Sequence, residues 1–223
     1  PQKGTASGTW SVVLSAKSTV GETRAEFNLV VSEVSLPLAS AIGGGTAVSG
    51  ITTPPTGAWI GVLRPLQSGT SGVVAQSGPI ADKGSTSLRF DLSVPGYTDP
   101  KSAPESPVTA QSSLSLMTFF WQTDTEPGKD IVRCLVDGAQ ARDMLTGQPL
   151  QLSGKTAWVK QTVLLPGSGT RKIEFVYTKD ANLRVGADRV WVYGLEVGKP
   201  PFIRASPVSS LRVTPGASTD SGT

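Results

Sequence analysis

Three aspartates stand where loop carboxylates could hold a metal ion. Asp180 and Asp188 flank a charged loop between two segments of alternating polarity, and Asp130 precedes another such segment. Ca²⁺ takes about six to eight oxygen ligands, which loop carboxylates and main-chain carbonyls can supply together. We therefore expect Asp180, Asp188 and Asp130 to be candidate ligands of a structural calcium ion. The alternative is that they are solvated turn residues with no ligand.

Aromatic side chains form the second chemically useful group, because their rings can stack on the apolar faces of sugars. Trp59 is flanked by glycines and Tyr97 lies in a proline-rich stretch. We expect both rings to be exposed and to be candidate carbohydrate-binding residues. Trp121 and Trp191 lie in strongly apolar segments, where a large ring is expected to fill core volume.

Catalytic chemistry has few residues to work with in this chain. Histidine is absent, so Ser-His-Asp and Cys-His sites cannot be built from it. Cys134 is the single cysteine, and its place in an alternating segment predicts a small buried hydrophobe. Glu174 and Glu196 could act as paired carboxylates only if the fold brought them into one cleft. We expect the chain not to be an enzyme.

Composition favours an all-β protein with many turns. The 223 residues include 25 Gly and 17 Pro, and only 17% are charged, against roughly 25% in an average domain. The net charge is +3 and the basic residues are scattered, which does not favour a nucleic-acid partner. No apolar run approaches the roughly 20 residues that span a bilayer, so no membrane span is expected.

Alternation of apolar and polar residues predicts the strands. Residues 9–31 form a predicted β-hairpin of two strands of about seven residues, turning at "STVGET". Residues 32–50 have the composition of a linker that passes into an irregular strand. Further strands are predicted in 57–62, 71–94, 113–124, 130–138, 155–165, 171–180 and 188–197, while 95–111 is predicted to be a long exposed loop. Roughly nine or ten strands without a convincing helix predict a β-sandwich.

Residues 72–197 resemble a concanavalin-like jelly-roll module of large secreted and surface proteins of bacteria. The resemblance rests on "GVVAQSGPIAD", "LSLMTFFWQ", "VDG", "LSG", "IEFVYTKD" and "GADRVWV" in this order. The chain departs from that family at Tyr193 and Gly194, where acidic residues would fall. The flanks resemble pieces of immunoglobulin-like repeats, the last two strands at 1–35 and a linker with a first strand at 200–223. The jelly roll would then occupy 36–199.

The resemblance implies an extracellular or cell-surface location and two candidate functions. One is a non-catalytic structural or adhesion module that assembles with other copies of itself, or with neighbouring domains, by strand complementation. The alternative is a lectin-like, carbohydrate-binding module with a polysaccharide partner and a calcium dependence.

Overall fold

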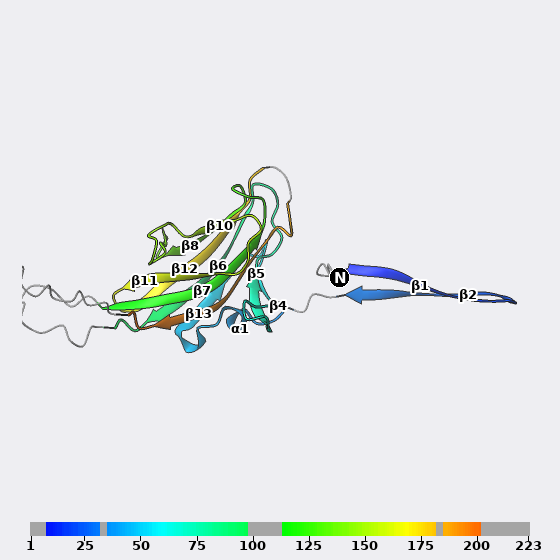
Figure 1. Ribbon diagram of the computed structural model, residues 1–223, viewed down its shortest axis with the longest axis horizontal. Helices are drawn as coiled ribbons and strands as arrows, with labels where there is room; N and C mark the ends of the chain where they lie inside the picture. Colours follow the sequence, from blue (N-terminus) through cyan, green and yellow to red (C-terminus); the bar gives the residue numbers. More distant parts are fainter. Residues whose placement is uncertain (1–7, 32–34, 98–112, 182–184, 202–223) are drawn as a thin grey trace, which may run out of the picture.

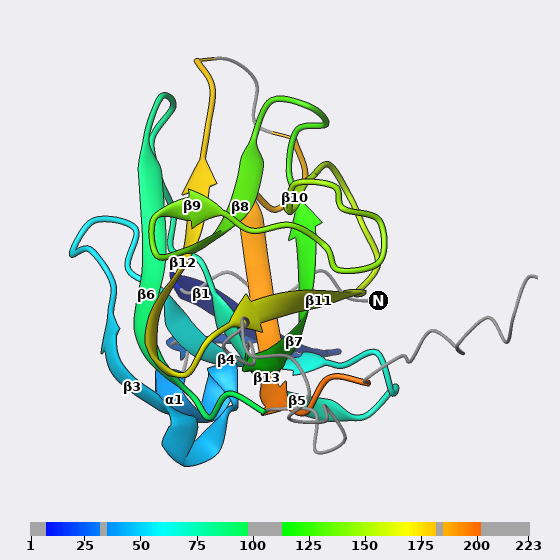
Figure 2. The same ribbon diagram turned by 90° about the vertical axis from the view of Figure 1, so that its left-hand side faces the viewer.

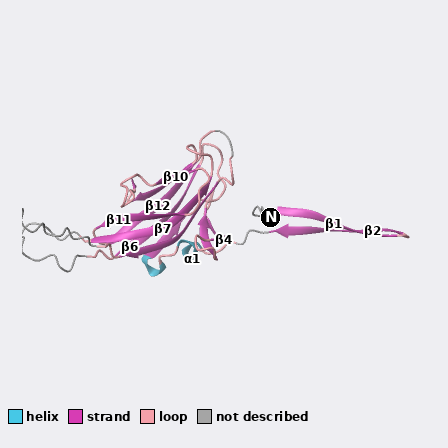
Figure 3. Ribbon diagram, viewed as in Figure 1, coloured by secondary structure: helices cyan, strands magenta, loops and turns pink. Residues whose placement is uncertain are grey.

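Two antiparallel sheets pack face to face to form the body of the protein (Figures 1 and 3). The computed structural model describes residues 8–31, 35–97, 113–181 and 185–201. The six-stranded sheet has the order β10-β8-β12-β6-β3, with β9 beside β8, and the five-stranded sheet has the order β11-β7-β13-β5-β4. This arrangement is an all-β jelly-roll sandwich, as the sequence predicts.

The strand bounds place every element of the two sheets. The six-stranded sheet is built from β3 (Val48–Thr52), β6 (Ser85–Val94), β8 (Ile131–Val136), β9 (Ala139–Gln140), β10 (Gln151–Ser153) and β12 (Gly169–Thr178). The five-stranded sheet is built from β4 (Ile60–Pro65), β5 (Ser71–Gln76), β7 (Leu114–Asp124), β11 (Val159–Pro166) and β13 (Arg189–Gly198). Figure 2 shows the strands of the two sheets running across one another.

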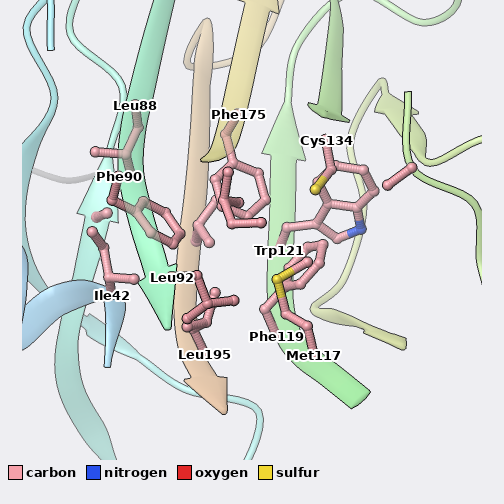
Figure 4. Packing of buried hydrophobic residues seen from close by; sticks show 14 of the residues in the cluster. Ile42, Leu88, Phe90, Leu92, Met117, Phe119, Trp121, Cys134, Phe175 and Leu195 are labelled. Atoms are coloured by element: carbon pink, nitrogen blue, oxygen red, sulfur yellow. The ribbon is translucent and has the colours of Figure 1, made fainter. Parts of the chain in front are cut away.

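The core lies between the sheets and follows directly from the period-two pattern of the longest strands. In β7, every second residue is buried, so Met117, Phe119 and Trp121 point inward and are fully enclosed. Phe119 meets Phe175 of β12 edge to face, with ring centroids 5.0 Å apart. Figure 4 shows these rings interleaved from both sheets. Their burial supplies the main stabilisation, at about 25 cal/mol per Å² of apolar surface.

Cys134 is a buried member of this core, as predicted. It lies in β8, is 0% exposed and packs near Trp121 (Figure 4). Burial raises the pKa of its thiol far above the ordinary value, because the apolar surroundings disfavour the thiolate. The side chain is therefore a small hydrophobe and not a nucleophile.

The segment expected to be a linker contains two short helical turns instead. These are α1 (Leu38–Ile42) and the 3₁₀ turn η1 (Gly45–Ala47). Ile42 is fully buried, so the turn carries an apolar side chain into the core. The chain then reverses at Gly43, whose φ of 89° suits glycine and whose added Cβ would lie 3.2 Å from main-chain atoms of Leu195. No helix in the described part of the chain is long and apolar enough to cross a membrane.

The N-terminal hairpin forms as predicted but is longer. Strands β1 (Gly8–Ser18) and β2 (Gly21–Val31) pair antiparallel around the turn at 19–20. Val12 pairs with Phe27 and Leu14 with Ala25, which places these apolar side chains on one face. Leu14 remains 60% and Phe27 47% exposed, so this face is uncovered in the described structure. The relation of the hairpin to an immunoglobulin-like repeat stays a prediction, and residues 202–223 lie outside the described residues.

Candidate functional site

The outer face of the five-stranded sheet carries a row of aromatic side chains. Alternation along β7 and β13 turns Phe120 and Tyr193 away from the core, while their neighbours Phe119 and Val192 point into it. Phe120 and Tyr193 are cross-strand partners whose rings stack, with centroids 5.0 Å apart and planes at 11°. On the other side of the ring, the Nζ of Lys160 lies 5.7 Å from the Phe120 centroid. We name Phe120, Trp158, Trp191 and Tyr193 the aromatic face.

Side chains and main chain from the two edges of the sheet meet across this outer face. Strands β4 and β11 are the opposite edges, and four strand spacings would hold them about 19 Å apart in a flat sheet. Yet the indole Nε1 of Trp158, one residue before β11, donates to the carbonyl of Pro65 at the end of β4, at 2.9 Å. Gln67 also donates its main-chain N–H to the Tyr193 hydroxyl at 3.2 Å. The β4–β5 turn therefore covers one end of the aromatic face.

A second small apolar cluster lies on the outer side of the sheet at this covered end, beneath a cation. Trp191 is 2% exposed and packs with Val62 and Val74 on the outer side of the sheet. The Arg64 guanidinium lies 3.6 Å from the Trp191 ring centroid, and it donates to the amide oxygen of Gln122. Burial lowers the pKa of Arg64, and the negative charge of Asp124 acts in the opposite direction.

The other, uncovered end of the aromatic face contains a β-bulge. The register of β13 on β7 shifts between Tyr193 and Glu196, and Gly194 has a φ of 65°. A Cβ at Gly194 would lie 3.4 Å from the Phe120 ring. Glu196 then faces solvent opposite Thr118. Positions 193 and 194 thus shape the aromatic face.

The predicted carbohydrate-binding residues do not form this site. Trp59 is 2% exposed and belongs to the core, so the expectation that it is exposed is wrong. Its flanking glycines mark close packing, since a Cβ at Gly61 would lie 2.5 Å from the carbonyl oxygen of Leu36. Tyr97 is half-buried where its main chain pairs with Leu114, and the predicted loop beyond it lies outside the described residues.

The two tryptophans expected in the core are both buried, but on different sides of the sheet. Trp121 is enclosed between the sheets, whereas Trp191 lies on the outer face under Arg64. Sequence reasoning did not single out Phe120 as a site residue. Strict alternation through "SLSLMTFFWQ" carries the signal, because it assigns Phe119 and Trp121 to one face and Phe120 to the other.

The predicted metal ligands are only partly brought together. Carboxylate oxygens of Asp130 and Asp180 lie within 4.8 Å of each other and of Glu126, which the sequence analysis did not select. Asp130 also accepts the main-chain N–H of Asp180 at 3.1 Å. Asp188 lies elsewhere, in an ion pair of 2.5 Å with Lys179. The expectation that Asp188 shares a site with Asp130 and Asp180 is therefore corrected.

Negative charge gathers at this end of the sandwich around buried groups. The Lys179 side chain is 0% exposed and contacts both Asp188 and, at 3.7 Å, Asp82. Burial raises the pKa of Tyr177, and the charges of Asp130 and Asp188 raise it further. Its hydroxyl therefore stays protonated at neutral pH.

The outer face of the six-stranded sheet has a different character. Two adjoining hollows of about 340 and 500 Å³ lie over β6, β12 and the bulged strand β3. Arg89, Asp91, Lys172 and Glu174 line them, and we name these residues the polar face. Arg89 and Glu174 form an ion pair of 2.6 Å across the strands. Glu196 lies on the other sheet, so the fold does not unite it with Glu174 in one cleft.

Comparisons with known proteins find β-sandwich structures and no family. No family model and no curated protein matches the chain. Solved structures similar to it include the secreted serine protease VesC from Vibrio cholerae, at 11% identity and a TM-score of 0.39. That match covers 79% of this chain and 30% of VesC.

Two further similar structures are carbohydrate-binding modules. The CBM22-1 xylan-binding domain from Paenibacillus barcinonensis is 12% identical with a TM-score of 0.36, and the match covers 75% of this chain and 97% of that domain. The family 11 module from Clostridium thermocellum, solved with a β-1,3-1,4-mixed-linked tetrasaccharide, is 10% identical with a TM-score of 0.34, covering 75% and 95%. At these identities and TM-scores the similarity does not decide what this chain binds.

Proposed function

We propose that the chain is a non-catalytic, extracellular glycan-binding β-sandwich module whose site is the aromatic face. The observation that carries the proposal is the row of stacked, partly exposed rings of Phe120 and Tyr193 beside Trp158. Ligand sites combine apolar and aromatic side chains with a few polar groups. Of the two sheet faces described, the aromatic face is the one that offers outward, stacked rings beside polar side chains.

The chemistry of a sugar chain matches the residues along the uncovered part of the aromatic face. The C–H groups of a pyranose ring can pack against the Tyr193 and Trp158 rings, whose planes lie at 82° with centroids 4.7 Å apart. Lys160 and Glu196 are exposed on either side of this position and can donate to and accept from sugar hydroxyls. Thr118 adds a hydroxyl between them.

Affinity gel electrophoresis with soluble polysaccharides tests the proposal. Xylan, mixed-linked β-glucan and laminarin in the gel should retard the wild-type chain if the site accepts them. Trp158→Ala should weaken binding about tenfold or more, since ring contacts contribute about 0.5–1.5 kcal/mol beyond their buried area. Arg89→Ala, on the polar face, is the matched control and should bind as the wild type does.

The outcomes separate the two faces. Equal retardation of wild type and Trp158→Ala, with loss in Arg89→Ala, would move the site to the polar face. The proposal would be contradicted if no polysaccharide retards the wild-type chain and calorimetry detects no binding of chitin or galactan oligomers. That result would favour an assembly role.

Assembly is the second candidate function, and the hairpin supports it. Its apolar face carries Val12, Leu14, Ala25 and Phe27 without a covering sheet in the described structure. A lone hairpin of this kind is marginally stable in water and gains by pairing with another chain. Light scattering of the intact chain should then show oligomers that Leu14→Lys converts to monomers. A monomeric wild-type chain at tens of micromolar would contradict self-assembly.

A further inference from the structure

The turn between β7 and β8 meets the end of β12 at a cluster of three carboxylates. Glu126 and Asp130 come from the turn, and Asp180 follows β12. We propose that Glu126, Asp130 and Asp180 form a binding site for a calcium ion that fastens this turn to the β12–β13 connection. The site lies apart from the aromatic face, so it does not depend on the proposed glycan binding.

Buried, unpartnered oxygens are the observation that points to a ligand. Asp130 is 0% exposed, and its Oδ2 has no hydrogen-bond partner, while its Oδ1 accepts from Asp180. The Oε2 of Glu126 is also buried and without a partner. Leaving a buried charged oxygen unsatisfied is strongly unfavourable, because it gives up water without a replacement. Two such oxygens in one cluster call for a positively charged group.

Among the described residues, no side chain supplies that charge to Glu126 or Asp130. Neither Glu126 nor Asp130 takes part in an ion pair within the described parts of the chain. The buried cation Lys179 is committed to Asp188 and Asp82. Like charges within 4.8 Å of one another repel, and the repulsion grows as water is excluded. A divalent cation among the three carboxylates reverses this repulsion.

Calcium fits the donor set better than the other common divalent ions. All three side chains are carboxylates, and oxygen-only sites suit Ca²⁺, Mg²⁺ and Mn²⁺, whereas Zn²⁺ favours nitrogen and sulfur ligands. Ca²⁺ completes a flexible shell of about six to eight oxygens with main-chain carbonyls and water, while Mg²⁺ demands a near-ideal octahedron. A surface turn with one buried and two half-buried carboxylates matches the more flexible ion.

The proposed ion would join the two sheets at one end of the sandwich. Glu126 lies two residues after β7 of the five-stranded sheet, whereas Asp130 directly precedes β8 and Asp180 follows β12, which are neighbours in the six-stranded sheet. Main-chain bonds already hold both parts, since Asp130 donates to the Glu126 carbonyl and Lys83 donates to the Asp180 carbonyl. The expected consequence is a higher melting temperature when the ion is bound.

The experiment titrates calcium chloride into the intact chain after removal of metals with EDTA. Calorimetry should show one site, and thermal unfolding should show a rise in Tm of about 5 °C at a hundredfold excess over the dissociation constant. Asp130→Asn keeps the shape of the side chain but should abolish both responses. Glu126→Gln, at a less buried position, should weaken binding at least tenfold and remains informative if Asp130→Asn fails to fold.

Asp188→Asn is the matched control, because Asp188 is a partly buried aspartate outside the three-carboxylate cluster and is paired with Lys179. It should lower the starting Tm yet keep the calcium-induced rise. Absence of heat and of any Tm change in the wild type at about 10 mM calcium chloride, above the weakest extracellular calcium sites, would overturn the proposal. An unchanged response in both Asp130→Asn and Glu126→Gln would overturn it too. An equal rise with magnesium chloride would overturn the assignment to calcium.

Discussion

The two outer faces of the sandwich are built by the same alternation and yet have opposite chemistry. On the five-stranded sheet, the outward positions of β7 and β13 include Phe120 and Tyr193. On the six-stranded sheet, the outward positions of β6 and β12 include Arg89 and Glu174. One face offers apolar rings that the sheet edges partly cover, and the other offers charges that neutralise each other. Period-two alternation therefore sets which residues face outward, while residue type and sheet curvature set what they can bind.

The difference shows in how much each face adds to stability. Trp191 is nearly enclosed by Arg64, Val62 and Val74, so its ring belongs to a small core of its own. Arg89 is 63% exposed, and a pair of this kind contributes about 0–1 kcal/mol because water and salt screen it. The Trp191 end of the aromatic face is thus packed and contributes to stability, whereas the ion pair of the polar face contributes little.

The largest expected effect tests this contrast at Trp191. Trp191→Ala should lower the free energy of unfolding by about 3–5 kcal/mol, since it opens a cavity under the Arg64 guanidinium and removes the hydrogen bond to Gln76. Urea unfolding followed by fluorescence of the remaining tryptophans measures it. Leu63→Ala, at a position that is 71% exposed on β4, is the control and should cost less than about 0.5 kcal/mol. If Trp191→Ala lowers the free energy of unfolding by less than about 1 kcal/mol, the cluster of Trp191, Val62 and Val74 is not tightly packed.

Much of this contrast could be predicted from the sequence, because alternation is a local signal. The hairpin, the central strand at 113–124 and the burial of Cys134 and Trp121 all follow from it. The turn at 38–42 was not predicted, since its five residues carry no helical period and only their contact with the core holds them. Short helical turns depend on tertiary packing more than on propensity.

The sites were harder to predict because they depend on distance in space. Trp59 has the local sequence of an exposed loop residue, but close packing at Gly61 shows that the neighbouring glycines admit other main chain. Glu126 and Asp188 are both acidic loop residues, and sequence alone does not say which lies beside Asp130. The choice is made by Lys179, which turns into the interior and draws Asp188 to itself.

The smallest expected effect sharpens the comparison from the polar side. Glu174→Gln removes the charge that faces Arg89 but keeps the size of the side chain, so stability should change by less than about 1 kcal/mol. The difference should shrink further in about 1 M salt, where the Debye length is only about 3 Å. Urea unfolding at low and high salt measures both changes, and glycan binding should stay at the wild-type level. A loss above about 2 kcal/mol that persists in high salt would show that the pair is shielded from solvent. The polar face, with its two hollows, would then be a second candidate binding face beside the aromatic face.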